Sequence, residues 1–138
     1  MKAGTLLRTT SILALLQGCA HTLMFLRAVP RHGPEEIAVL EAMKFHRFDF
    51  LGSVRSYWDF YFGYGLFAAF NCFVEAVLFW QLAALASAGA ATRPIIALFC
   101  LANVGYALLC WRYFFITPIV PDVAIAICLL LAFRAGSN

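Results

Sequence analysis

The sequence predicts an all-α integral membrane protein, a four-helix up-down bundle with a structured loop after the first span. Of its 138 residues, 64% are hydrophobic and 12% are charged, against about 25% charged residues in soluble domains. Four apolar stretches each approach or exceed the roughly 20 residues that a membrane-spanning helix needs. Most connections between them are short, which makes consecutive spans antiparallel neighbours. A soluble domain of this size could not bury so much apolar surface, so the lipid bilayer is the expected solvent.

The four predicted spans belong to a single transmembrane domain over residues 1–138, and they cover about 5–29, 57–86, 93–115 and 117–133. The first span contains Leu16-Gln17-Gly18-Cys19, which resembles a bacterial lipoprotein signal. The chain continues with apolar residues instead of a polar tether, so we expect an uncleaved span. The third span begins at Arg93-Pro94, where proline suits the first helical turn.

The second span opens with aromatic residues of the kind that gather at a membrane–water interface. They are Tyr57, Trp58, Phe60, Tyr61, Phe62 and Tyr64. Arg55 and Asp59 are four positions apart, which predicts an ion pair at the start of the helix. Gly63 and Gly65 lack side chains, which favours close approach of another helix.

The loop over residues 30–56 carries its own structural signals. Pro34 followed by Glu35 and Glu36 predicts the start of a short helix, with proline and acidic residues in the first turn. Residues 45–52, FHRFDFLG, interleave aromatic and charged side chains, which favours a cap lying on the mouth of the bundle. A mobile connector is the alternative interpretation.

Polar side chains share one face of each of the first three spans, because residues 3, 4 or 7 apart lie together on a helix. Such groups face lipid only at a heavy cost in free energy, so we expect them to face the bundle interior. The candidate pocket residues are Gln17, His21, Tyr64, Asn71, Glu75, Asn103, Tyr106 and Asp122.

Depth along the spans predicts specific partners for these residues. Gln17, Asn71 and Asn103 lie near mid-span and could form an interhelical amide network. His21 and Asp122 lie at a similar depth toward the loop, which predicts a carboxylate–imidazole pair.

Glu75 lies toward the opposite side of the bilayer and has no obvious basic partner, Thr10 being the nearest polar candidate. Three interpretations of this polar interior remain open: simple attachment of the helices, a ligand or substrate pocket, and a proton or ion path.

Signatures of common enzymes are missing from the sequence. It has no HExxH, GxSxG, phosphate-binding loop or dinucleotide fingerprint, so we expect no cofactor and leave the catalytic residues unassigned. Three histidines are too scattered for a compact metal motif, and no metal site is expected. The five cysteines form no CxxC pair and are expected to pack as small hydrophobic residues. The net charge of +3 favours no nucleic-acid partner.

The stretch from Phe48 to Leu66, FDFLGSVRSYWDFYFGYGL, resembles a group of small four-span bacterial membrane proteins related to the DoxX-like proteins. The resemblance implies the four-span fold and a place in the bacterial inner (cell) membrane, without implying a reaction. The layout is more distantly similar to the EXPERA group of sterol isomerases and sterol-binding proteins. That likeness implies a lipid-facing pocket in which Glu75, His21 and Asp122 would take part.

The function that we favour from the sequence is binding of a lipid-like or small amphipathic ligand in a polar pocket within the bundle. One alternative is a non-catalytic accessory subunit that docks a membrane-protein partner. Another is a membrane enzyme that shuttles protons on a lipid substrate, with His21 or Glu75 as proton donor or acceptor and Asp122 orienting the histidine.

Overall fold

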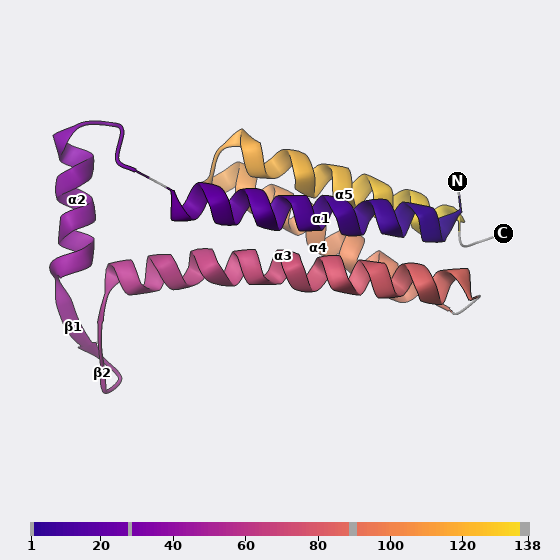
Figure 1. The fold of residues 1–138 in the computed structure, drawn as a ribbon, viewed down its shortest axis with the longest axis horizontal. Helices are drawn as coiled ribbons and strands as arrows, with labels where there is room; N and C mark the ends of the chain where they lie inside the picture. The colour runs from indigo at the N-terminus through magenta and orange to yellow at the C-terminus, as the bar shows by residue number, and fades with distance from the viewer. Residues whose placement is uncertain (1, 28, 89–90, 136–138) are drawn as a thin grey trace. The chain divides into compact units, whose positions relative to one another are not determined.

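The computed structural model describes residues 2–27, 29–88 and 91–135, and Figure 1 shows its elements. Four of its helices are long and apolar enough to cross a membrane: α1 (Ala3–Leu26), α3 (Tyr57–Ser87), α4 (Arg93–Tyr113) and α5 (Ile116–Ala135). This result confirms the predicted all-α, four-span class and fits an integral membrane protein. The predicted ends agree closely, the largest difference being Val29 against Leu26, although Ala28 lies outside the described residues.

The chain divides into two compact parts. The four-helix part comprises residues 2–18, 71–88 and 91–135. The loop part comprises residues 19–27 and 29–70.

In the four-helix part, successive helical segments alternate in direction (Figure 1). Its apolar core is made of aliphatic and aromatic side chains with almost no exposure to solvent: Leu7, Phe79, Ile96, Ile125 and Leu129. Phe79 meets Phe99 edge to face, with 5.1 Å between ring centroids. This contact joins α3 to α4.

Small residues of α1 face α3 at every seventh position. These residues, which we call the α1–α3 seam, are Gly4, Ser11 and Gly18. A Cβ added at Gly18 would lie only 3.1 Å from the Cβ of Cys72, and one at Gly4 would overlap the Ser87 hydroxyl. Ser11 Oγ donates a 2.6 Å hydrogen bond to the carbonyl of Ala76. Small residues thus let the two helices approach closely, as is common in membrane proteins.

The loop part contains the helix α2 (Pro34–Phe45), which confirms the predicted start at Pro34. Its acidic first turn holds Glu35 and Glu36, and the preceding Gly33 has a φ of 96°, a backbone conformation that glycine adopts without strain. The helix ends before His46, whose backbone N–H donates to the carbonyl of Ala42.

A β-hairpin follows α2 and was not foreseen from the sequence. Strand β1 (Arg47–Phe50) pairs antiparallel with β2 (Ser53–Ser56). The two-residue turn between them, Leu51-Gly52, has positive φ at both positions (53° and 80°), as in the hairpin turns that match strand twist. Strand β2 ends at Ser56, and α3 begins at the next residue.

Candidate functional site

Asp122 is the less exposed of the two acidic residues of the four-helix part. The residue is 3% exposed and lies in the first turns of α5, directly after Pro121. Gln17 Nε2, from α1, donates a 2.7 Å hydrogen bond to Asp122 Oδ1. The Cys110 thiol, from α4, is a second hydrogen-bond partner. Three helices therefore meet at this carboxyl group.

A second acidic side chain lies nearby on α3. The partly buried Glu75 hydrogen-bonds to the side chain of Asn103, which is 1% exposed. Asn103 Nδ2 also donates to the carbonyl of Phe99 at 3.0 Å. The Glu75 and Asp122 carboxyl groups are close enough to interact electrostatically. We call Gln17, Glu75, Asn103 and Asp122 the carboxyl–amide centre.

The partners of these two acids are amides and a thiol. Three arginines of the same part lie over aromatic rings instead: Arg8 over Trp80, Arg93 over Phe133 and Arg112 over Tyr113. An amide N–H donates to a carboxylate, and an amide carbonyl accepts from a protonated carboxyl. The centre can therefore hold either protonation state of its acids, which suits proton exchange or contact with a polar ligand group.

The predicted pair of His21 with Asp122 stays a prediction, and each residue has a partner within its own part of the chain. The His21 Nε2–H donates to the carbonyl of Gly65 at 3.0 Å, and its ring stacks on Phe25 with 5.8 Å between centroids. Gln17, about one turn earlier on α1, is the residue that reaches Asp122. A neutral amide satisfies the carboxyl group without placing a second charge in the bilayer.

The predicted amide network of Gln17, Asn71 and Asn103 does not form, and some of the predicted pocket residues are exposed. Gln17 and Asn103 bond to acids, whereas Asn71 is exposed. Tyr64, expected in the pocket, is 75% exposed. Asn71 does share a helical face with Glu75, but it is Glu75 that meets Asn103 of α4. Tyr106, at 43% exposure, lies at the edge of the site.

Thr10 is not the partner of Glu75. Its hydroxyl donates to the carbonyl of Leu6 within α1 at 3.0 Å, and it also hydrogen-bonds to Cys128. Asn103 takes the predicted place beside Glu75. The distance along each helix predicted the depth of Glu75, but not which neighbouring helix would lie opposite.

Helical spacing places Cys110 on the inward face of its span, seven residues after Asn103, but sequence reasoning assigned its thiol no role. A cysteine in an apolar segment usually packs as a small hydrophobic residue. Here its thiol meets a buried carboxyl group. All five cysteines are free.

The ion pair at the start of α3 also differs from the prediction. Asp59 Oδ2 lies 3.7 Å from Nη2 of Arg47, whereas Arg55 Nη1 donates to the carbonyl of Val54. Asp59 further accepts from the backbone N–H of Ser56 at 2.9 Å, and Ser56 Oγ accepts from the Asp59 N–H. The hairpin register places Arg47 opposite Ser56, which brings its guanidinium to Asp59.

An apolar groove of about 460 Å³ runs between α4 and α5. It is lined by Cys100, Val104, Ala107, Leu108, Trp111, Ile119, Val123, Ala126, Ile127 and Leu130. At about 100° per residue, the groove face lies roughly a quarter turn from Asn103 on α4 and from Asp122 on α5. Seen from the groove, the carboxyl–amide centre therefore lies behind the line along which α4 and α5 meet.

No family model, no curated protein and no solved structure matches this chain. Among the described residues, no three His, Cys, Asp or Glu side chains are arranged to hold a metal ion.

Proposed function

We propose that this chain is a membrane protein that binds a lipid-like or small amphipathic ligand. The apolar body of the ligand lies in the α4–α5 groove, and its polar group points between α4 and α5 toward the carboxyl–amide centre. The observation that carries the proposal is the almost complete burial of Asp122 a quarter turn from an apolar groove. We also propose, from the stretch Phe48–Leu66, that the chain is related to the DoxX-like proteins.

Energetics support a functional role for the centre. An acidic side chain in the middle of a membrane helix costs roughly 2.5–3.5 kcal/mol, whereas an interhelical hydrogen bond in a membrane returns about 1 kcal/mol. Holding helices together with two acids therefore has a net cost in free energy. The α1–α3 seam shows that this chain also joins helices by close packing of small residues, which does not carry this cost.

Native mass spectrometry of the gently solubilised protein, followed by extraction and identification of bound lipids, tests the proposal. Leu108→Trp fills the groove, whereas Leu101→Trp makes the same change on α4 outside the groove, at a residue that is 71% exposed. We expect a specific co-purifying lipid that Leu108→Trp displaces and Leu101→Trp retains. Asp122→Asn should weaken its retention. Equal retention by all of these variants would contradict the proposal.

One observation favours a second candidate, an accessory subunit of a larger membrane complex. Among the described residues, every buried side-chain nitrogen or oxygen has a hydrogen-bond partner. A fully paired polar interior can serve structure alone. In that case the protein would be recovered without a specific lipid and in association with another polypeptide.

A further inference from the structure

The apex of the β-hairpin carries an apolar residue in an unfavourable conformation. Leu51 has a φ of 53°, a region in which Asn, Asp and Gly are the usual residues of a two-residue hairpin turn. It is also 92% exposed, and its neighbours Phe50 and Val54 are 51% and 55% exposed. A leucine at this position costs free energy both through backbone strain and through contact with water.

Aromatic contacts fix the hairpin to the first turns of α3. Phe48 lies 5.0 Å from Tyr57 between ring centroids, and Phe50 meets Phe60 edge to face at 5.4 Å. These contacts hold the two strands against a helix that is apolar enough to span the membrane. The position of the apex is therefore set by the start of α3.

The start of α3 belongs at the membrane–water interface. The helix has 31 residues and so measures about 46 Å at 1.5 Å per residue, whereas the hydrocarbon core is about 30 Å thick. Its aromatic first turns match the belt of Trp and Tyr at headgroup depth. Within the loop part, the hairpin runs across the direction of these turns (Figure 1), which directs the apex along the membrane plane.

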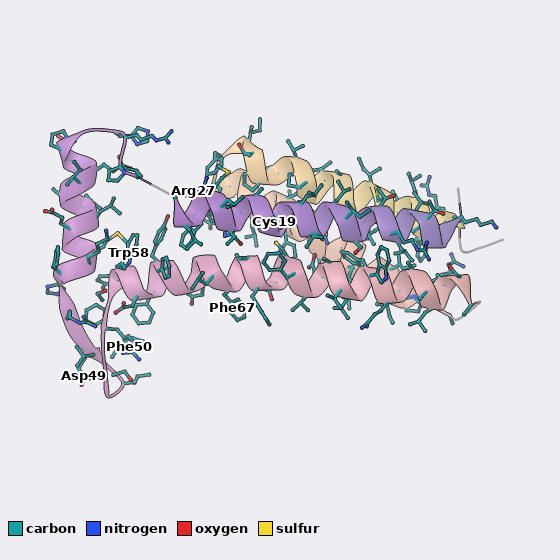
Figure 2. All side chains as sticks on the ribbon, in the orientation of Figure 1. Cys19, Arg27, Asp49, Phe50, Trp58 and Phe67 are labelled. Carbon is teal, nitrogen blue, oxygen red and sulfur yellow. The ribbon has the colours of Figure 1, made fainter. Side chains whose placement is uncertain are left out.

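The side of α3 that carries the hairpin is shaped to accept lipid. A shallow apolar hollow of about 260 Å³ is lined there by Asp59, Phe60, Gly63, Tyr64 and Phe67. Figure 2 shows Phe67 on the hairpin side of α3, whereas Trp58 leaves the opposite side toward α2. Lys44 Nζ covers the Trp58 ring at 4.6 Å. The hollow therefore continues the lipid-facing surface of the span up to the hairpin.

The charges of the hairpin fit an anionic lipid surface. Its strands carry Arg47 and Arg55 against one acid, Asp49. The Asp49 carboxylate accepts the Gly52 N–H at 2.8 Å, which stabilises the turn. The Arg47 side chain is 59% exposed despite its contact with Asp59. Arginines beside exposed apolar residues are the pattern of segments that lie in the headgroup region of a bilayer.

We propose that the hairpin apex inserts into the headgroup region of the membrane that α3 spans. Leu51, Phe50 and Val54 contact the upper acyl chains, and Arg47 and Arg55 bind anionic lipid phosphates. This proposal concerns the loop part and does not depend on the ligand site between α4 and α5.

Hydrogen–deuterium exchange of the full chain tests insertion. Leu51→Asn should change the exchange rate in opposite directions for an apex that lies in water and for an apex that is inserted in the bilayer. Asparagine adopts positive φ more readily than leucine, so in water this change would stabilise the turn and slow exchange at residues 50–54. In vesicles of phosphatidylcholine and phosphatidylglycerol, we expect it instead to speed exchange several-fold by withdrawing the apex. Leu51→Phe, which keeps an apolar apex, should preserve the slow exchange.

Slower exchange in the Leu51→Asn variant would overturn the proposal, as would equal exchange by all three proteins. The phosphate contacts have a separate test. Arg55→Gln should speed exchange in vesicles that contain phosphatidylglycerol and have little effect in pure phosphatidylcholine. An equal effect of Arg55→Gln in the two lipids would remove the anionic headgroups from the proposal.

Discussion

Gln17 Nε2 donates a 2.7 Å hydrogen bond to Asp122 Oδ1 although the two residues are 105 positions apart. The bond joins the first membrane-spanning helix to the last. It gives a buried carboxyl group a neutral donor, and it fixes the face of α1 that meets α5. Stability of the four-helix part should therefore depend on both residues together.

Replacing Gln17 by leucine should lower the free energy of unfolding by about 1 kcal/mol, the usual strength of an interhelical hydrogen bond in a membrane. The carboxyl group of Asp122 loses a donor while it stays buried. In an Asp122→Leu background the same change should cost little, because no acceptor remains. Unfolding of the four proteins in a double-mutant cycle measures the coupling.

Gln81→Leu provides the matched control, since Gln81 is an exposed glutamine on α3 and its replacement should have little effect. An equal loss for Gln17→Leu with and without Asp122 would show that the hydrogen bond contributes nothing.

Replacing His21 by phenylalanine should lower stability by about 1 kcal/mol through loss of the hydrogen bond to the Gly65 carbonyl. The aromatic ring that stacks on Phe25 is kept. Because His21 and Asp122 share no hydrogen-bond partner, the effects of His21→Phe and Asp122→Asn should add. Thermal unfolding of both single variants and the double variant checks this, and a large departure from additivity would instead support the pair expected from the sequence.

Gly65→Ala should destabilise the protein by about 1–3 kcal/mol, the usual cost of overpacking, because the new Cβ would overlap the ring of Phe25. Gly63→Ala makes the same change two residues earlier, where nothing lies within 4 Å. It should be neutral or stabilise the helix by about 0.5–1 kcal/mol. Thermal unfolding compares them, and Phe25→Leu should partly rescue Gly65→Ala. Equal effects of the two alanines would refute the predicted clash.

The segment before α2 should loosen in acid through Glu36. Backbone N–H groups of His32 and Arg31 donate to its carboxylate at 2.7 and 2.6 Å, and these bonds lower its pKa below the ordinary value of 4.5. A lowered folded-state pKa means that the stabilisation is complete above pH 4.5 and is lost as the pH falls through the folded-state pKa.

Amide exchange of His32 and Arg31, measured across this acid range, should show the loss. Glu36→Gln should remove the pH dependence, whereas Glu41→Gln, farther along the same helix, should leave it in place. A His32 amide whose protection ignores Glu36→Gln would contradict the assignment.

The sequence was sufficient to predict the spanning helices, because their signal is apolar length. The third span begins at Arg93, where it was expected from the following proline. The hairpin was missed, since β1 and β2 have four residues each and lie between two helices. Alternation of Phe48 and Phe50 with charged residues, followed by a glycine at position 52, was the signal that could have revealed it.

The candidate site was only partly predictable. Periodicity correctly placed Gln17, Glu75 and Asn103 toward other helices, because polar groups in a bilayer must find protein partners. It could not assign those partners, since a rotation of one helix by a single residue changes which side chains meet. Asn71 shows the limit, because it shares a face with Glu75 and is nevertheless exposed.

The seven-residue spacing of Gly4, Ser11 and Gly18 along the α1–α3 seam has a consequence for how this sequence can vary. At lipid-facing positions such as Leu101, any apolar residue of any volume leaves the packing unchanged. At the seam, the requirement is an upper limit on volume, because an added Cβ would displace the Ser87 hydroxyl at Gly4 and would lie 3.1 Å from the Cys72 Cβ at Gly18. In a saturation mutagenesis library, tolerance at these three positions should therefore follow side-chain size more closely than hydrophobicity.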